Sequence, residues 1–423
     1  MILRIVKTTI SLFLICLFSL YILLQFATCK SIDGRPQEII LAPTPLAETD
    51  LREHDSVRLV ATDVYKGGWL KRVLQGETYR EAWATPISVP ILWLDTLNGG
   101  IIADDKGGGD QTLSLDLVDS TGMVYTIRSI NKDPSGLVAP WVEKIGLANI
   151  IMDGISAQHP YGALAIPPLS DAANVYHTNP RLYFVPPQEN LGKFSEEFGN
   201  RLFYLEYEPE GEHFWNALDT VIEIVDTYDV QQAIKKNENA HIDTLMLLRA
   251  RMLDLIIGDW DRHAEQWGWV ETKQGGQTIF YPIATDRDNI FYKIGGVIPW
   301  IINRPIFVKR LRPFKKKIDY MKGLIHPFDS YFLYDIPLSY YQKAAQEVQT
   351  NVTDEVIINA IAHLPPELYS QDGERLIKTI QARRNQLPQF ADKFYQAIQK
   401  RGPQTEPIKG DPKYEKKFGK KDR

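Results

Sequence analysis

Two groups of polar residues in the second half of the sequence carry the side chains needed to bind a metal ion. The first contains Asp259, Asp261 and Gln266 within eight positions, directly after a long apolar segment. The second contains Asp286 and Asp288, and Asp286 lies 25 positions after Asp261. Carboxylate and amide oxygens are hard ligands that suit Mg²⁺ or Mn²⁺. A metal held in this way commonly bridges the oxygens of a polyphosphate.

A predicted β-hairpin between the two groups brings them together. Trp267 to Thr272 and Thr278 to Ala284 have the pattern of strands, and Lys273-Gln274-Gly275-Gly276 between them is typical of a tight turn. Because the two ends of a hairpin lie side by side, we expect the polar groups to meet in space. The alternative is a network that only caps the preceding helix, with Arg262 paired to a neighbouring aspartate.

The order of these elements resembles the C-terminal lobe of protein kinases. The segment Asp261-Arg262-His263-x-x-Gln266 is similar to the Asp-Arg-His-x-x-Asn catalytic loop of phosphoinositide lipid kinases and other atypical kinases, with Gln266 at the position of the asparagine. The segment Asp286-x-Asp288-x-x-Phe291 is similar to the metal loop of the CotH-type spore-coat kinases and of the Golgi secretory-pathway kinases.

This resemblance implies a role for each residue of the two segments. Asp261 is implied to accept or orient the proton of an attacking hydroxyl. Arg262 and His263 are implied to be structural residues that orient the catalytic aspartate. The implied ligands of the Mg²⁺ or Mn²⁺ ion are Gln266, Asp286 and Asp288.

A glycine-rich segment in the first half of the sequence is similar to the phosphate-binding loop of HipA-like kinases. Lys106-Gly107-Gly108-Gly109-Asp110-Gln111-Thr112 lies between two predicted strands, and glycine lets backbone N–H groups approach a phosphate closely. Taken alone, the same run also fits a flexible hairpin tip. The nucleotide-binding residues that the resemblance implies here are Gly107, Gly108, Gly109 and Gln111.

The next predicted strand, Val124 to Arg128, lies where these families carry Val-Ala-x-Lys. The cation here is Arg128, and Lys132 follows four positions later. A guanidinium can replace a lysine as a clamp on phosphate oxygens. We expect Asp153, on a predicted helix from Trp141 to Gln158, to hold this cation in place. A solvent-exposed carboxylate at Asp153 is the alternative.

The distribution of predicted elements indicates the fold class. Strands with turn signals, such as Thr112 to Val118, dominate the first half, whereas Gln231 to Gly258 and Tyr340 to Lys400 have helical spacing. We therefore predict an α+β chain with a two-lobed, kinase-like fold. The N-terminal lobe is β-rich and covers residues 49–208, and the helical C-terminal lobe covers residues 209–400. A ligand cleft is expected between the lobes.

The first thirty residues predict export from the cytoplasm. Arg4 and Lys7 precede an uncharged run of 21 residues, Thr8 to Thr28, which is long enough to cross a hydrocarbon core. The run ends at Cys29 and resembles a bacterial lipoprotein signal with Cys29 as the lipidated residue, although two residues before it depart from the usual pattern. A retained transmembrane anchor is the alternative, and both interpretations place the body outside the cytoplasm.

The composition restricts the remaining possibilities. The 423 residues are 44% hydrophobic and 24% charged, which is typical of a globular protein. The formal net charge of −5 does not favour nucleic-acid binding. Both cysteines, Cys16 and Cys29, lie in the export segment, which excludes a disulfide framework or a thiol nucleophile from the body. Residues 31–48 are predicted to form a linker and residues 401–423 a solvated basic tail.

Together these features predict a phosphotransferase that uses metal-bound ATP or another nucleotide outside the cytoplasm. Its acceptor is not indicated, its predicted membrane contact is through the N-terminus, and no nucleic-acid partner is expected. A non-catalytic, kinase-like binding lipoprotein stays open, and Arg128 and Gln266 at the lysine and asparagine positions favour it. The second alternative is a metal-dependent phosphoesterase with two metals held by Asp259, Asp261, His263, Asp286 and Asp288.

Overall fold

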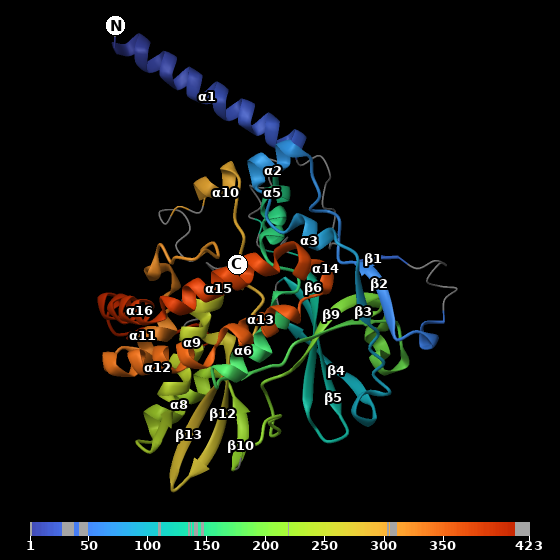
Figure 1. Cartoon of the computed structure of the whole chain (residues 1–423), viewed down its shortest axis with the longest axis vertical. Coiled ribbons are helices and arrows are strands. Elements are labelled where there is room, and N and C mark those ends of the chain that lie inside the picture. The colour runs from blue at the N-terminus through green and yellow to red at the C-terminus, as the bar shows by residue number, and fades with distance from the viewer. Residues whose placement is uncertain are drawn as a thin grey trace.

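Strands dominate the first half of the protein and helices the second half in the computed structural model (Figure 1). The predicted α+β class and the order of its parts are therefore confirmed. The structure describes residues 2–27, 38–41, 50–108, 111–133, 148–218, 220–302 and 311–410, together with positions 136, 138, 143, 144 and 304.

A five-stranded antiparallel sheet with the order β4-β5-β6-β9-β8 occupies the N-terminal part. Leu113, Leu115 and Leu117 of β5 are buried in a core that Phe203 and Leu205 of β9 also enter. The predicted strands Thr112 to Val118 and Val124 to Arg128 lie within β5 and β6, which pair in antiparallel orientation. The strands are β4 (Ile101–Gly108), β5 (Thr112–Asp119), β6 (Val124–Lys132), β8 (Arg181–Val185) and β9 (Arg201–Tyr207).

The predicted hairpin forms the centre of a second sheet. β12 (Trp267–Gln274) and β13 (Gln277–Ala284) pair in unbroken register, with Trp267 opposite Ala284. Gly275 and Gly276 form the turn, and both have positive φ, a conformation that glycine adopts without steric cost. The remaining strands of this sheet are β7 (Tyr176–His177), β10 (Val221–Val225) and β11 (Ala240–Ile242).

A third, small sheet has the order β1-β2-β3. β3 is an edge strand of this sheet, which is where Pro90 can be accommodated because proline has no N–H to donate. Two short helices lie between β2 and β3 in the sequence. The bounds are β1 (Ile39–Ile40), β2 (Ser56–Val60), α2 (Trp69–Gln75), α3 (Arg80–Ala84) and β3 (Ile87–Pro90).

The helix α9 (Thr244–Ile257) is the centre of the helical part, and every residue from Met246 onward is buried. Asp243 caps its start by accepting a hydrogen bond from the N–H of Met246, and Gly258 ends it with φ +78°. The other helices of this part are α8 (Thr227–Lys236), α10 (Val297–Ile302), α11 (Pro327–Leu333), α12 (Leu338–Asn351), α13 (Asp354–Ala362), α14 (Pro366–Leu368), α15 (Glu374–Asn385) and α16 (Leu387–Arg401).

Two predicted helices differ from the sequence pattern within the described residues. The segment Gln231 to Gly258 is interrupted by β11, because these residues pair in parallel with β13. The segment Trp141 to Gln158 contains α5 (Ala148–Asp153), which then tightens into a 3₁₀ turn over Gly154–Ala157.

The largest hydrophobic core extends across residue 208, where the two lobes were predicted to divide. It joins Leu59 of β2, Ile87 of β3 and Leu169 of α6 (Ile166–Ala172) to Leu247 of α9 and Ile380 of α15. The five-stranded sheet has a separate core, to which Phe198 of the short helix α7 (Ser195–Phe198) belongs. The division at residue 208 stays a prediction, and β2, β3 and α6 pack with the helical part.

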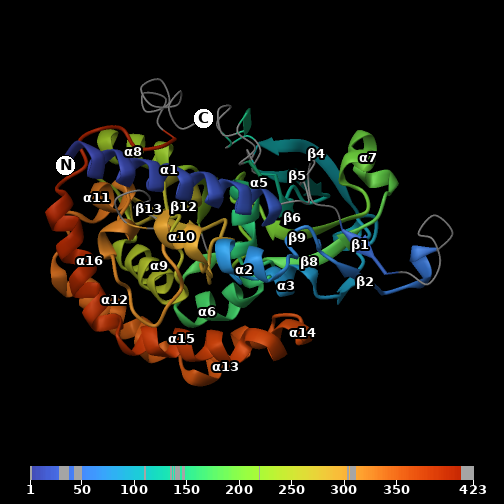
Figure 2. The ribbon, with the colours of Figure 1, turned by 90° about the horizontal axis from the view of Figure 1, so that it is seen from above.

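α1 (Ile2–Ala27) extends from the body beside α2 (Figures 1 and 2). Its window Val6–Leu23 has a mean hydropathy of 2.0 and is not buried against the rest of the molecule. A helix of this length and composition is compatible with a membrane span or with a signal sequence. Cys29 and most of the predicted linker lie outside the described residues.

The start of the predicted tail packs against the body. Ile408 is buried, and the Nζ of Lys409 lies 2.7 Å from a carboxylate oxygen of Glu265. The expectation of a solvated tail from residue 401 is therefore wrong for these residues, because an apolar side chain and an ion pair hold them. Residues 411–423 lie outside the described part of the chain.

Candidate active site

The hairpin β12–β13 brings the two polar groups together, as the sequence predicts. Gln266 immediately precedes β12, and Asp286 lies two residues after Ala284, the last residue of β13. The Nε2 of Gln266 donates a hydrogen bond of 2.9 Å to the Oδ2 of Asp286. Asp286 itself has φ +48°, a left-handed conformation that aspartate tolerates better than most residues.

Arg262 fastens the loop before β12 to the end of β13. Its guanidinium is fully buried and donates to the backbone oxygens of Thr285 at 2.6 Å and of Gln266 at 2.8 Å. It also lies 3.7 Å from Asp259, the type of contact that the capping alternative predicted. The arginine therefore fixes the distance between the two polar groups, a structural role in agreement with the resemblance.

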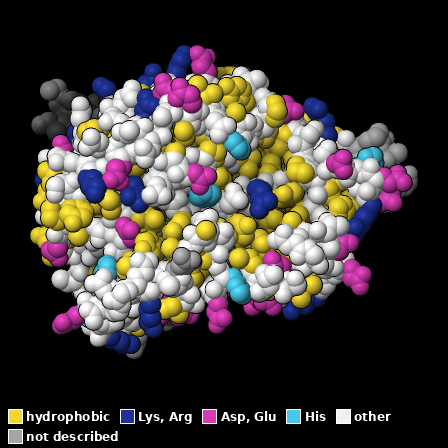
Figure 3. Space-filling view, turned by 60° about the horizontal axis from the view of Figure 1, so that its bottom comes forward, with side chains coloured by type: hydrophobic (Ala, Val, Ile, Leu, Met, Phe, Trp, Pro, Cys, Tyr) yellow, Lys and Arg dark blue, Asp and Glu magenta, His cyan; other side chains and the backbone are white. Residues whose placement is uncertain are grey.

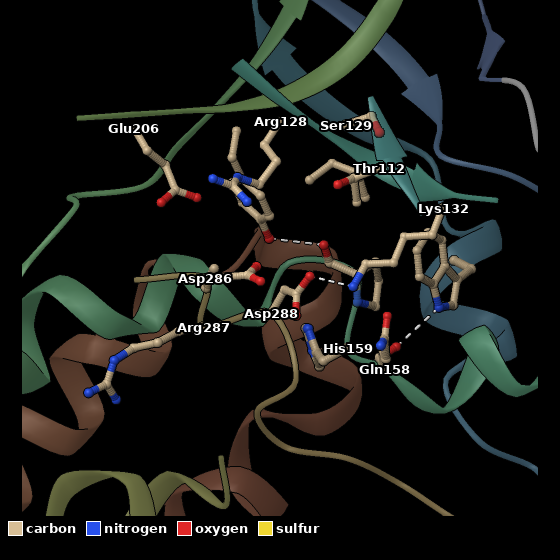
Figure 4. A pocket seen from close by; sticks show the side chains of 15 residues that line it. Thr112, Arg128, Ser129, Lys132, Gln158, His159, Glu206, Asp286, Arg287 and Asp288 are labelled. Atoms are coloured by element: carbon tan, nitrogen blue, oxygen red, sulfur yellow. Dashed lines mark hydrogen bonds and ion pairs between the residues drawn. The ribbon is translucent and has the colours of Figure 1, made fainter. Parts of the chain in front are cut away.

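The buried carboxylate of Asp254 forms ion pairs with arginines of both loops, the one before β12 and the one after β13. Asp254 of α9 lies 2.8 Å from Arg287, 3.5 Å from Arg262 and 2.7 Å from Arg251. Burial alone would raise the pKa of Asp254, but the three guanidinium groups outweigh it and hold the pKa below its usual value. Arg287 points away from the cavity in Figure 4, toward this support.

Two cations from β6 face the aspartates after β13 (Figure 4). Lys132 forms an ion pair with Asp288, and both side chains are largely buried. Arg128 lies between Glu206 and Asp286 and is 3.7 Å from Glu208. Burial would lower the pKa of Arg128, but the surrounding carboxylates raise it, so the arginine is permanently charged.

The two aspartates of this loop differ in their electrostatic surroundings. Burial would raise the pKa of Asp286, but Arg128, Lys132 and the hydrogen bond from Gln266 together lower it. Burial raises the pKa of Asp288 to about 6, and the neighbouring charge of Asp286 adds to this despite Lys132. The first carboxylate is therefore ionised more readily than the second.

Asp261 lies beside this loop. Asn289 Nδ2 is 3.5 Å from its Oδ2, and the Nε2 of His263 is 4.0 Å from its Oδ1. The Nε2 atoms of His263 and Gln266 are 3.4 Å apart. Asp261, His263 and Gln266, three of the four residues that the resemblance places in the catalytic loop, therefore form one local cluster next to Asp286.

A narrow cavity of about 30 Å³ lies between the cations of β6 and the carboxylates of Asp286 and Asp288, and neither Asp261 nor Gln266 lines it. Within the described part of the chain, the Oε1 of Gln266 and the Oδ1 of Asp288 are buried without a hydrogen-bond partner. Two unpaired oxygens next to the carboxylate of Asp286 fit the oxygen ligands that Mg²⁺ or Mn²⁺ prefers. Cavity-lining side chains that Figure 4 labels are Thr112, Arg128, Ser129, Lys132, Gln158, His159, Glu206, Asp286, Arg287 and Asp288.

Within the described part of the glycine-rich segment, only Thr112 lines this cavity, and Gly107, Gly108 and Gln111 do not. Gly107 and Gly108 belong to β4, and Gly107 has no room for a side chain because a Cβ would lie 2.7 Å from the Oγ of Ser114. The N–H of Asp133 donates to the oxygen of Gln111 at 2.7 Å, and Thr112 pairs with Lys132 across the sheet. Gly109 lies outside the described residues.

Asp153 does not hold the cations of β6 as expected. Its carboxylate makes a buried pair with Arg80 of α3, and Lys71 of α2 lies 2.9 Å away. The prediction was wrong because these partners come from helices about seventy residues earlier in the sequence, which the pattern around Asp153 does not indicate.

Several residues of the site were not predicted. Glu206 and Glu208 compensate Arg128, and burial raises the pKa of both, that of Glu208 to about 7. Glu206 interrupts the apolar run of β9 and Glu208 directly follows the strand, a signal that the sequence contains. Gln158 donates to the Oδ1 of Asn289 at 2.8 Å, a contact across 131 positions that no local pattern indicates.

Comparisons with known proteins give distant structural neighbours only. No family model and no curated protein matches this sequence. The Helicobacter pylori proinflammatory kinase CtkA aligns with a TM-score of 0.39 and 11% identity, covering 70% of this chain and 95% of its own. HipA of Shewanella oneidensis, from a complex with HipB and operator DNA, aligns with a TM-score of 0.34 and 11% identity, covering 72% and 70%. Because these scores are too low to support an argument about this chain, the functional assignment depends on the site itself.

Proposed function

We propose that the protein is a kinase-like phosphotransferase that uses a metal-bound nucleotide, ATP or a related one, outside the cytoplasm. The observation that supports this most is the convergence at one cavity of two kinds of group. One kind is the carboxylate oxygens of Asp286 and Asp288, and the other is the cations Arg128 and Lys132. Gln266 does not line the cavity but donates a hydrogen bond to Asp286. A nucleotide triphosphate needs both kinds of group, because its oxygens must be neutralised from more than one side.

In the proposed reaction, each residue has a defined task. The oxygen of an acceptor hydroxyl forms a bond to the γ-phosphorus, and the bond from that phosphorus to the β–γ bridging oxygen breaks. Asp261 takes the hydroxyl proton, and the nucleoside diphosphate leaves with the electron pair. Arg128 and Lys132 neutralise phosphate oxygens. Gln266, Asp286 and Asp288 are the residues that would hold Mg²⁺ or Mn²⁺, which supplies charge stabilisation to the transferred group.

The ion pair between Lys132 and Asp288 favours one alternative, a non-catalytic binding protein. It occupies a proposed metal ligand, and the cavity of about 30 Å³ is far smaller than a nucleotide. Nucleotide binding therefore requires this pair to separate. A protein in which the pair never separates would keep the fold of the site without its activity.

The two-metal phosphoesterase has less support. Among the described residues, no group of three or more His, Cys, Asp and Glu side chains is arranged to hold a metal ion. A pair of metals needs such groups, whereas a single metal shared with a nucleotide needs one or two carboxylates and an amide.

The test is binding of nucleotide and metal by the purified full chain, followed by transfer of label from γ-labelled ATP. We expect Mn²⁺-dependent ATP binding that Asp286→Ala abolishes and that Asp335→Ala, at an exposed position between α11 and α12, leaves unchanged. Binding without label transfer to any offered acceptor or to water indicates the non-catalytic protein. Absence of binding for all common nucleoside triphosphates contradicts the proposal, and phosphate release from a monoester without ATP indicates the esterase.

A further inference from the structure

Large apolar side chains are exposed on the side of the molecule where α1 leaves the body. Trp69 and Val73 lie on α2, and Val297, Trp300 and Ile301 lie on α10. We call these five residues the α2–α10 face. Trp69 is 76% exposed and Trp300 is 62% exposed. Exposed apolar groups gathered in this way mark a contact surface rather than ordinary protein surface.

Glycine contacts hold the two helices of this face together. A Cβ on Gly76, which ends α2, would lie 2.3 Å from the oxygen of Gly295. A Cβ on Gly296, which precedes α10, would lie 2.3 Å from the nitrogen of Gly76. The backbones therefore touch at a point where no side chain fits, and the face is a fixed surface composed of both helices.

A cavity of about 790 Å³ adjoins the face and combines apolar and cationic walls. Val73, Val297 and Trp300 contribute to its apolar wall, and Asp319 is the one carboxylate among the described residues that line it. Its volume is within the range of small-molecule sites. The cationic side chains of the lining are Arg304, Arg312, Lys315, Lys317 and Arg383.

The charges of this cavity are accessible to a negatively charged surface. Arg304, Lys315 and Lys317 are exposed, and the guanidinium of Arg304 lies 4.2 Å from the centre of a Trp300 ring. Burial lowers the pKa of Arg383 to about 9, which leaves it cationic at neutral pH. By contrast, the side of the molecule seen in Figure 3 has acidic and basic side chains interspersed.

We propose that the α2–α10 face docks on an anionic phospholipid membrane. The apolar side chains enter the bilayer interface, and the cations of the adjoining cavity receive lipid phosphate groups. Tryptophan, arginine and lysine are the residues that occupy this boundary in membrane proteins. α1 lies beside α2 and passes over α10 in Figure 2, so a bilayer that holds α1 is next to this face. The proposal is independent of the phosphotransferase activity.

The test places an environment-sensitive fluorophore on the face of the full chain. In a Cys16→Ser, Cys29→Ser background, Val297→Cys is labelled, and the protein is reconstituted in nanodiscs. The matched control is label at Ile102→Cys, a position that is 62% exposed on β4, away from α2 and α10 (Figure 1). The nanodiscs contain phosphatidylcholine alone or with 30% phosphatidylglycerol, and a lipid-borne nitroxide serves as quencher.

On the anionic nanodiscs only, we expect the label at position 297 to report an apolar environment and its fluorescence to be quenched at least twofold. The label at position 102 should show neither change. Arg304→Glu with Lys317→Glu removes the quenching, and circular dichroism confirms that this variant of exposed residues is folded. Equal quenching on neutral nanodiscs overturns the role of the cations. If the label at position 297 keeps the fluorescence of a water-exposed group on the anionic nanodiscs, docking is overturned. If its environment becomes apolar as the protein concentration rises, without quenching by the lipid-borne nitroxide, the face binds a second copy of the chain instead.

Discussion

Lys132 and Asp288 compete with the ligands that the site is proposed to bind. Their ion pair is largely buried, and the Oδ1 of the same carboxylate has no hydrogen-bond partner in the described part of the chain. A metal ion that binds Asp288 must displace the positive charge of Lys132 from the carboxylate. A phosphate that binds Lys132 replaces the negative charge of Asp288 beside the ammonium group. Lys132 therefore opposes binding of the metal ion and assists binding of the phosphate.

Replacing Lys132 by methionine separates these two effects. We expect Mn²⁺ to bind the nucleotide-free Lys132→Met variant about three- to tenfold more tightly than the wild type, because Asp288 no longer forms an ion pair with the lysine. ATP in the presence of Mn²⁺ should bind about tenfold more weakly, because a phosphate contact is lost. Paramagnetic relaxation of water protons measures the first constant and equilibrium dialysis the second. The control is Lys273→Met on the exposed end of β12, and a variant that shifts both constants in the same direction contradicts the assigned role.

His159 is a second residue whose surroundings have a measurable effect, in this case on the pH dependence of stability. Its ring is buried between Tyr79 and Phe291, and its Nδ1 accepts a hydrogen bond of 3.1 Å from the N–H of Tyr161. Burial is the main cause that lowers its pKa to about 4, with Arg375 and Lys293 adding to this against Asp372. The folded protein therefore keeps the ring neutral at pH values where an unfolded chain protonates it.

This difference predicts a loss of stability in acid. The unfolded state binds a proton below pH 6.5 and the folded state does so only near pH 4, so stability is present above pH 6.5 and is lost as the pH falls. His159 should account for about 2 kcal/mol of the decrease between pH 7.5 and pH 5. His159→Asn, whose side-chain oxygen can replace Nδ1 as acceptor, should show a decrease smaller by that amount in urea denaturation. Parallel pH profiles for the two proteins would disprove the assignment.

At the scale of elements, the end of α9 sets the position of the loop that contains Asp261, the residue proposed to be catalytic. Gly258 ends the helix with φ +78°, and three residues later the chain reaches Asp261. A Cβ on Gly258 would lie 2.7 Å from a ring carbon of Phe314. Both the backbone conformation and the packing therefore require glycine at this helix end.

Gly258→Ala should reduce the free energy of unfolding by about 2 to 4 kcal/mol, combining the left-handed conformation with overpacking. Gly275→Ala in the hairpin turn, with φ +56° and open space around its Cβ position, should cost about 1 kcal/mol because only the conformational part applies. Chemical denaturation of both variants measures the difference. Equal losses would show that Phe314 moves aside without cost.

The elements that position the site were predictable where the signal was local. The turn at Gly275 and Gly276 fixes the register of its own hairpin, so the meeting of Gln266 and Asp286 follows from the sequence alone. The partners of Asp153 did not follow, because Arg80 reaches it only after β2, β3 and α5 pack together. Local pattern determines neighbours along a hairpin, whereas contacts between elements depend on the packing of the whole core.

At the scale of the whole molecule, α1 is the helix predicted to attach the protein to a membrane. The full chain should remain with the membrane fraction after alkaline carbonate extraction, and deletion of residues 2–27 should release it from tight association. Cys29→Ser separates the two predicted modes of attachment. If the variant stays in the membrane fraction and its mass differs from the wild type only by the substitution, the protein has a transmembrane anchor. If the wild type is cleaved and carries the mass of acyl groups, and the variant is neither cleaved nor acylated, the protein is a lipoprotein. Recovery of the wild-type chain in the soluble fraction contradicts both.

The buried carboxylate of Asp254 determines which part of the molecule can move. Pulling the loop of Arg262 away from that of Arg287 leaves guanidinium groups buried without their shared counter-charge, which is a large free-energy penalty. The two loops therefore travel as one stiff unit with α9. We therefore expect the cavity to widen by movement of the five-stranded sheet, which carries both Arg128 and Lys132 on β6. The nucleotide proposed for this site would then separate the sheet from the helices.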